Sequence, residues 1–251
     1  MQFTVTSSSV TNNSQPSHRL VGRSPQAAVF DCDGLLVDSA HCWERAYATI
    51  AAARGRSLED VRLERLLGAS VAGAASLVTE DLDAPVGERE LHAALVDSFA
   101  AAPPAPLPGA RELIAELAGR MPLGVASNGP RAIVLGVLDQ LGVRGRFAAI
   151  VSAEETACDK PAPDVYLEAC RRLGVAPADA VAFEDSPLGA RAARRAGLAV
   201  VVAAPAPGPQ PDADLVVPTL ADARVHAFLG LAGAGEPAPA LSRAAAPTIA
   251  D

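Results

Sequence analysis

Two aspartates stand one residue apart at the end of an apolar run, in the stretch VFDCDGLLVDS at 29–39. Like charges this close repel each other, and each carboxylate resists removal from water, so Asp31 and Asp33 are costly at the end of a buried strand. Taken alone, the pair fits three interpretations: a metal site, a catalytic pair, or a surface turn at Asp33-Gly34.

The elements that must position these aspartates are indicated by the apolar pattern of the chain. Short apolar runs, typical of strands buried on both faces of a parallel sheet, recur between helical patterns. This alternation predicts an α/β fold with a doubly wound parallel sheet, which binds ligands at the carboxyl ends of its strands. The expected strands fall within 27–33, 121–128, 147–155, 180–186, 197–203 and 213–219.

One long segment interrupts the alternation. Between about 40 and 102 no strand pattern appears, and apolar residues such as Trp43 and Tyr47 recur at helical spacing. The proline-rich stretch 103–109 cannot continue a helix and suits a stiff connector. We therefore predict disordered tails at 1–24 and 231–251, a catalytic core from 25–39 and 103–230, and an inserted helical cap domain at 40–102.

Composition narrows the possible partners and the compartment. The formal net charge of −8 argues against nucleic acid or an anionic membrane as the main partner. The four cysteines form no CxxC pair, which favours reduced thiols and a cytoplasmic location. The first residues lack the pattern of a signal peptide, and no apolar stretch is long enough to span a membrane. We expect no membrane association, and we assume a monomer.

Polar residues follow several of the expected strands and should meet at one edge of the sheet. Carboxylates from two different strands suit a hard divalent cation, and Mg²⁺ is the ion we expect. Each string alone also has a plainer interpretation, since a serine can cap a helix, a lysine can be solvated, and acids favour a helix N-terminus. The candidate site residues are Asp31, Asp33, Ser127, Asn128, Lys160, Glu184 and Asp185.

Four short motifs together resemble those of the haloacid dehalogenase superfamily. DCDGLLVDS at 31–39 resembles its first motif, DxDGxLxDS. ASN at 126–128, DKPAPD at 159–164 and FEDS at 183–186 are similar to the second, third and fourth motifs, in the same order. The helical segment after the first motif is similar to the C1 cap of the subgroup that contains β-phosphoglucomutase and many sugar-phosphate phosphatases.

The resemblance implies a two-step phosphoryl transfer. Asp31 would be the nucleophile that becomes an aspartyl phosphate, which splits one difficult displacement into two easier ones. Asp33 would protonate the leaving alkoxide and then deprotonate the attacking water.

The resemblance also implies how phosphate and metal are held. Mg²⁺ would be bound by the Asp31 carboxylate, the main-chain carbonyl of Asp33 and Asp185, with Glu184 as a further ligand or a supporting group. Phosphate oxygens would be held by Ser127 and Lys160, with Asn128 as an adjacent polar contact.

The function implied is a Mg²⁺-dependent phosphatase acting on a small phosphorylated metabolite, a sugar or sugar-acid phosphate. A phosphomutase resembling β-phosphoglucomutase is the alternative, although Trp43 stands where such mutases have a histidine and Leu67 where a lysine is expected before Gly68. An alternative of another class is a catalytically silent metabolite-binding protein on the same scaffold.

Overall fold

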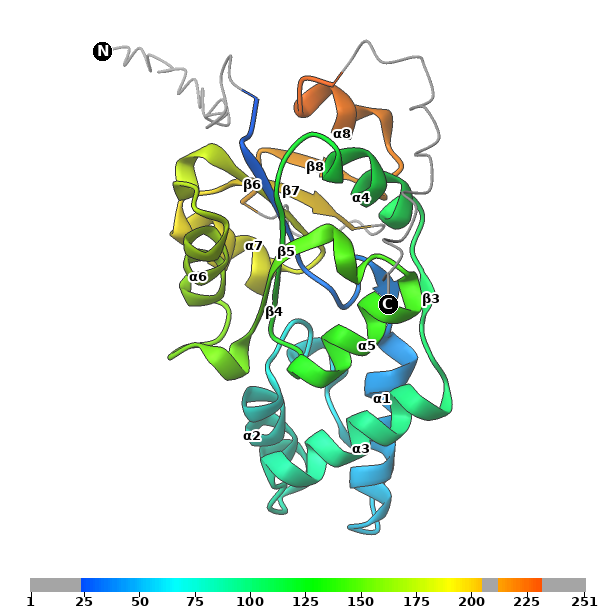
Figure 1. Ribbon diagram of the computed structural model, residues 1–251. Helices are drawn as coiled ribbons and strands as arrows, with labels where there is room; N and C mark the ends of the chain where they lie inside the picture. Colours follow the sequence, from blue (N-terminus) through cyan, green and yellow to red (C-terminus); the bar gives the residue numbers. More distant parts are fainter. Residues whose placement is uncertain (1–23, 205–211, 232–251) are drawn as a thin grey trace, which may run out of the picture.

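Six parallel strands form the central sheet of the computed structural model, which describes residues 24–204 and 212–231 (Figure 1). The strand order is β5-β4-β1-β6-β7-β8, and each strand lies within one of the apolar runs predicted above. The predicted α/β class with a doubly wound parallel sheet is therefore confirmed. The strands are β1 (Ala27–Phe30), β4 (Leu123–Ser127), β5 (Phe147–Ser152), β6 (Ala180–Glu184), β7 (Ala199–Ala203) and β8 (Leu215–Val217).

Helices cover both faces of this sheet (Figure 1). Successive strand residues point to opposite sides, so Ala28 and Phe30 of β1 join one hydrophobic core while Ala27 and Val29 join the other. The first core is closed by α4, α5 and α8, and the second by α6 and α7. These helices are α4 (Ala110–Ala118), α5 (Arg131–Leu141), α6 (Asp164–Leu173), α7 (Pro187–Ala196) and α8 (Ala223–Phe228).

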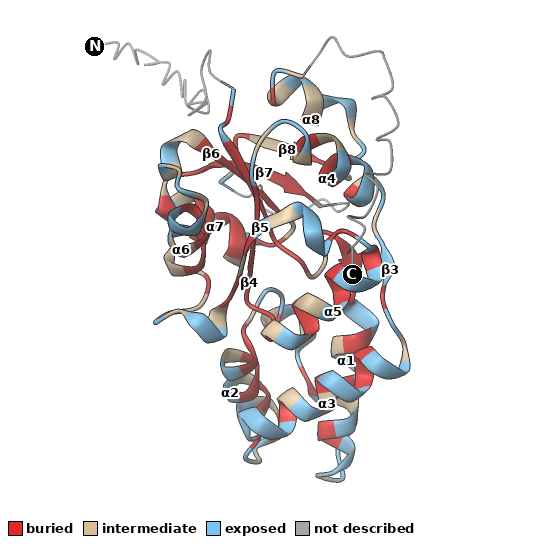
Figure 2. Ribbon diagram, viewed as in Figure 1, coloured by how far each residue is buried: buried red, intermediate tan, exposed pale blue. Residues whose placement is uncertain are grey.

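Burial explains why the central strands read as continuous apolar runs. Every residue of β1, β4, β6 and β7 is buried, and Figure 2 shows exposed residues mainly on the outer faces of the helices. The rings of Phe30 and Phe183 stack across β1 and β6 with centroids 4.7 Å apart. Charged residues are thereby confined to the strand ends.

A helical segment extends from one end of the sheet (Figure 1). Its longest helices, α1 (Ala40–Ala52) and α3 (Glu88–Ala101), pack against each other, and α2 (Val71–Leu82) packs on α3. Tyr47, one of the residues predicted at helical spacing, is buried in α1, and Leu95 is buried in α3. The short 3-10 helices of the chain are η1 (Leu58–Asp60), η2 (Leu63–Arg65), η3 (Arg144–Arg146), η4 (Ala153–Glu155) and η5 (Pro177–Asp179).

The chain enters and leaves the helical segment through a small antiparallel ribbon that the sequence analysis did not predict. β2 (Val37–Asp38) pairs with β3 (Ala105–Pro106), so the proline-rich stretch expected to be only a connector also contains a strand. The two crossings into the segment therefore lie side by side.

The expected tails fall almost wholly outside the described residues, at 1–23 and 232–251. Within the part of the chain that is described, no helix has the length and apolar character needed to cross a membrane.

Candidate active site

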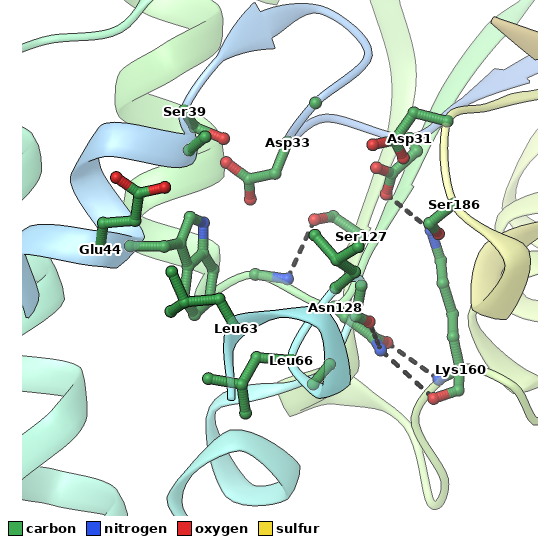
Figure 3. Close-up of a pocket in the computed structure, with 18 of the residues that line it drawn as sticks. Asp31, Asp33, Ser39, Glu44, Leu63, Leu66, Ser127, Asn128, Lys160 and Ser186 are labelled. Atoms are coloured by element: carbon green, nitrogen blue, oxygen red, sulfur yellow. Dashed lines mark hydrogen bonds and ion pairs between the residues drawn. The ribbon is translucent and has the colours of Figure 1, made fainter. Parts of the chain in front are cut away.

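Six of the seven residues predicted from the sequence line one pocket at the carboxyl edge of the sheet (Figure 3). The seventh, Glu184, ends β6 and is fully buried beside Lys160. Segments far apart in the sequence supply these side chains, and the parallel topology brings their ends together. The residues lining the pocket are Asp31, Asp33, Ser127, Asn128, Lys160 and Asp185.

The turn after β1 brings the first motif close to the fourth. The backbone N–H of Asp31 donates to the carbonyl of Phe183 (2.9 Å), and Gly34 turns the chain at a positive φ of 78°. A Cβ on Gly34 would lie 2.1 Å from Oδ2 of Asp185. Glycine is therefore required here both for backbone conformation and for the approach of the Asp185 carboxylate.

Lys160 provides the positive charge of the pocket. Its Nζ donates to Asp31 Oδ1 and to Glu184 Oε1, each at 2.6 Å, and lies 5.1 Å from the centroid of the Tyr166 ring. Burial alone would lower the pKa of Lys160, but the charges of Asp31 and Glu184 outweigh it, so the pKa lies above its ordinary value. Lys160 is therefore a permanent cation, held in a fixed place.

Three carboxylates crowd together beside this lysine. Oxygens of Asp31, Glu184 and Asp185, which we call the carboxylate cluster, lie within 4.8 Å of one another. Burial raises the pKa of Asp31 to about 7, an effect that Lys160 opposes and Glu184 adds to. Burial, together with the charges of Asp31 and Glu184, also raises the pKa of Asp185 well above its usual range. A lone lysine does not neutralise these three carboxylates, and the hard oxygen donors of Asp31 and Asp185 fit a small divalent cation such as Mg²⁺.

Glu184 has its hydrogen-bonding capacity filled by protein groups. Oε1 accepts from Lys160 Nζ and from the Tyr166 hydroxyl (2.5 Å), and Oε2 accepts from the backbone N–H of Asp185 (3.2 Å) and from Ser186 Oγ (3.3 Å). A carboxylate offers about four acceptor positions, so little capacity remains for another partner. The carboxylate therefore fixes the lysine in place.

Asp33, in contrast, retains an unused oxygen. Its Oδ1 is buried and has no hydrogen-bond partner among the described residues. Burial raises the pKa of Asp33, while hydrogen bonds from Ser39 and Trp43 lower it in part. An unpaired buried carboxylate oxygen is costly, and here it belongs to a residue that lines the pocket. It can exchange a proton with a bound molecule.

Ser127 and Asn128 stand at the end of β4, where the chain turns. Ser127 Oγ accepts from the backbone N–H of Gly129 (3.0 Å). The Asn128 side chain accepts from the Lys160 N–H (2.9 Å) and donates to the carbonyls of Lys160 (3.3 Å) and Gly68 (2.8 Å). Asn128 thus ties the loop carrying Lys160 to the helical segment.

Comparison with known families agrees with this geometry. Residues 25–197, more than half of the chain, match the haloacid dehalogenase-like hydrolase family. The chain belongs to this family. The resemblance expected from the four motifs is confirmed.

Individual relatives of this hydrolase are phosphatases by name. Validoxylamine A 7'-phosphate phosphatase of Streptomyces hygroscopicus subsp. limoneus is 35% identical over 179 residues, covering 69% of this chain and 83% of that protein. Fructose-1-phosphate phosphatase YqaB of Escherichia coli strain K12 is 32% identical over 181 residues, covering 69% and 93%. The solved structure of CbbY from Rhodobacter sphaeroides in complex with phosphate is similar with a TM-score of 0.66 and 29% identity, covering 79% of this chain and 96% of that one.

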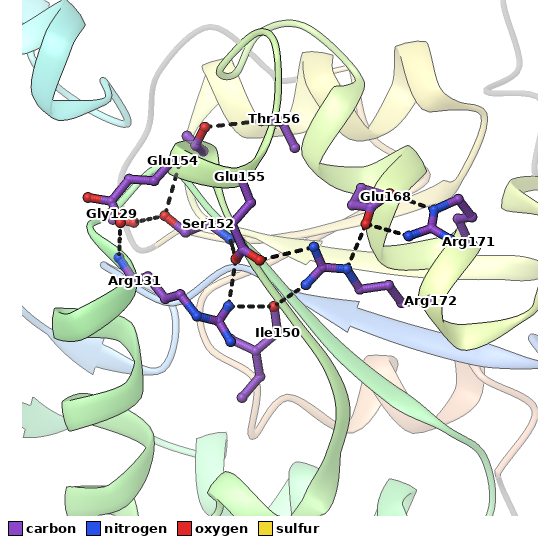
Figure 4. Close-up of polar contacts among 11 residues, drawn as sticks. Gly129, Arg131, Ile150, Ser152, Glu154, Glu155, Thr156, Glu168, Arg171 and Arg172 are labelled. Atoms are coloured by element: carbon purple, nitrogen blue, oxygen red, sulfur yellow. Dashed lines mark hydrogen bonds and ion pairs between the residues drawn. The ribbon is translucent and has the colours of Figure 1, made fainter.

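A polar network links the loop after β4 of the hydrolase to β5, η4 and α6 (Figure 4). The Glu155 carboxylate accepts from Arg131 (2.5 Å) and Arg172 (3.0 Å), which also donate to the carbonyl of Ile150. Ser152 Oγ donates to the carbonyl of Gly129 (2.8 Å). The start of α5 and the end of α6 are thereby fixed to β5, and with the start of α5 the loop that follows Ser127.

Two residues that complete the hydrolase site were not predicted from the sequence. Tyr166 was not identified, although a tyrosine on the buried face of a helix needs a partner for its hydroxyl and so signals a polar contact. Ser186 was noted only as the last letter of the fourth motif. It caps α7 by accepting from the Gly189 N–H (3.1 Å) and donates to Glu184.

Proposed function

We propose that this protein is a Mg²⁺-dependent phosphatase that hydrolyses a small phosphorylated sugar through an aspartyl phosphate on Asp31. The observation that carries the proposal is the pairing of Asp31 with the buried Lys160 in a pocket where Asp33 presents an unpaired oxygen. The phosphatase names of the relatives support the same chemistry.

In the first step, a carboxylate oxygen of Asp31 attacks phosphorus while the bond from phosphorus to the sugar oxygen breaks. Asp33, protonated at this stage, donates its proton to the departing sugar oxygen, so the sugar leaves as a neutral alcohol. Burial raises the pKa of Asp33, which favours the protonated form that this step uses.

In the second step, Asp33 takes a proton from water as the water oxygen attacks the phosphorus of the aspartyl phosphate. The bond from phosphorus to Asp31 breaks, orthophosphate leaves, and both aspartates return to their starting states. One water is consumed for each ester cleaved.

The remaining predicted residues hold charge in place. Lys160 and Ser127 would bind phosphoryl oxygens. Asp31, Asp185 and the main-chain carbonyl of Asp33 would hold Mg²⁺, which when bound neutralises negative charge shared by the phosphoryl group and the carboxylates.

The hydrogen bonds of Glu184 and Asn128 limit the roles that these two residues can have. Because four protein groups already donate to the Glu184 carboxylate, we assign it a supporting role toward Lys160. Because the amide of Asn128 is bonded to Lys160 and Gly68, we assign it a positioning role in place of the phosphate contact expected from the motif.

We also propose that the protein is a monomer located in the cytoplasm. All four cysteines lie among the described residues and none forms a disulfide bond, which supports a location in a reducing compartment.

The test is release of phosphate from p-nitrophenyl phosphate in the presence of Mg²⁺. Asp31→Asn should lower kcat by at least about 1,000-fold, because the amide cannot act as the nucleophile. Asp97→Asn, a substitution at an exposed position of α3 outside the pocket, should match the wild type. An Asp31→Asn enzyme with more than a tenth of wild-type activity would refute the proposal.

A further inference from the structure

The pocket has a second half, which the phosphate chemistry does not use. Across from the carboxylate cluster it is lined by apolar and aromatic side chains of the helical segment, and one of them, Leu67, is 65% exposed. These side chains offer flat and apolar surfaces against which the C–H faces of a sugar can pack. They are Trp43, Leu63 and Leu67, together with the largely buried Tyr47 and Leu66.

The charges around the pocket are strongly unequal. Lys160 is the only cationic side chain among the residues lining it, and both Asp31 and Glu184 already pair with that lysine. Asp38 and Glu44 also line the pocket, are exposed, and form no ion pair with any described residue. Figure 3 shows Glu44 on the opposite side of the pocket from Lys160, with Asp33 between them.

We propose that this pocket selects phosphate monoesters that carry a single phosphate on a neutral or cationic remainder, and that Glu44 is a specificity-determining residue. The inference rests on the proposed function. A second phosphate or a carboxylate on the remainder would lose its hydrating water in the pocket without gaining a cationic partner there. Asp38 and Glu44 would also repel this second anionic group. An ammonium group there would instead be attracted to Glu44. The sequence predicts either a sugar phosphate or a sugar-acid phosphate as substrate, and this selection favours the sugar phosphate.

A matched substrate series tests the selection. We would measure kcat/KM with Mg²⁺ for glucose 6-phosphate, glucosamine 6-phosphate below the pKa of its amine, and glucose 1,6-bisphosphate. The wild type should prefer both monophosphates to the bisphosphate by about tenfold or more at low ionic strength, and salt should reduce the preference. Glu44→Lys should shift the ratio of bisphosphate to monophosphate kcat/KM upward by about fivefold or more, because it reverses a charge at the pocket.

The control is Asp97→Lys, which makes the same change of charge on α3 outside the pocket and should leave the ratio at its wild-type value. A wild type that cleaves the bisphosphate as well as the monophosphates would overturn the inference. So would an equal shift of the ratio in Glu44→Lys and Asp97→Lys. Failure of the wild type to cleave even p-nitrophenyl phosphate would instead refute the proposed function, so the two failures are distinguishable.

Discussion

At the scale of single residues, the site depends on side chains packed tightly around buried charge. Glu184 is fully buried and accepts four hydrogen bonds, and removing a partner from such a group leaves charge without compensation. The backbone of α7 approaches this carboxylate at Gly189, where a Cβ would lie 1.9 Å from Oε1. Glu184 therefore requires a glycine at that helical position.

Gly189→Ala should destabilise the fold by about 1–3 kcal/mol, because the added methyl group forces the Glu184 carboxylate or α7 to move. Chemical denaturation measures the change in the free energy of unfolding. The matched control is Gly136→Ala in α5, where a Cβ would meet no atom within 4 Å. That variant should be stabilised by about 0.5–1 kcal/mol, since alanine favours a helix. Equal effects of the two substitutions would contradict this account of Gly189.

At the scale of elements, the loop between η2 and α2 joins the helical segment to the core on both sides of Lys160. The carbonyl of Gly68 accepts from Asn128, and the hydroxyl of Ser70 donates to the carboxylate of Asp159. Both contacts adjoin the segment that carries the lysine. Polar contacts thus hold this loop beside the part of the pocket that contains Lys160, and the same contacts hold the segment that carries the lysine.

Ser70→Ala should lower kcat/KM for p-nitrophenyl phosphate by about three- to tenfold, because one hydrogen bond that seats the loop is lost. Ser70 also caps α2 by accepting from Gly73 (3.1 Å), so Asp159→Ala serves as the second variant, breaking the same contact without touching that cap. The two variants should have similar kinetics, and the double variant should be little worse than either single one. Additive losses would show that the Ser70–Asp159 contact does not seat the loop.

The elements differ in how far the sequence predicts them. The four central strands were found because they are buried on both faces and read as apolar runs. The edge strands β5 and β8 are only partly buried, but their sequences are also apolar. The ribbon of β2 and β3 was missed because its strands have two residues each, too few to show a period, and one of them contains Pro106. The Gly68–Asn128 bond joins residues 60 positions apart, and only the folded packing reveals it. The motifs indicated which residues gather at the pocket, but not that the oxygens of Glu184 are filled by Tyr166 and Ser186.

At the scale of the whole molecule, the chain carries a net charge of −8, and the pocket likewise has more carboxylates than cations. A protein that buries the carboxylate cluster against one lysine gains stability from any ligand that relieves the repulsion. Divalent metal should therefore act on the stability of the fold as well as on activity.

Adding Mg²⁺ should raise Tm more at pH 8 than at pH 5. Burial raises the pKa of Asp31 to about 7, above its value in the unfolded chain. The folded state thus holds this proton more tightly, and without metal the free energy of unfolding falls as pH rises from about 4 to about 7. Mg²⁺ competes with the same proton, so its stabilising effect grows over this range.

Differential scanning calorimetry with and without Mg²⁺, at matched ionic strength, measures this effect. Asp185→Asn should remove most of the shift in Tm, and Asp97→Asn should retain it. A shift of the same size in both variants would indicate that Mg²⁺ binds elsewhere.

The central claim is that the phosphoryl group passes through a covalent intermediate on Asp31, and the stereochemical course at phosphorus tests it most directly. A phosphorothioate ester made chiral at phosphorus with two oxygen isotopes would be hydrolysed in water of the third isotope, and the configuration of the thiophosphate product determined. Two successive in-line displacements, one by Asp31 and one by water, predict retention of configuration. Inversion would mean that water attacks the substrate directly, and it would contradict the account.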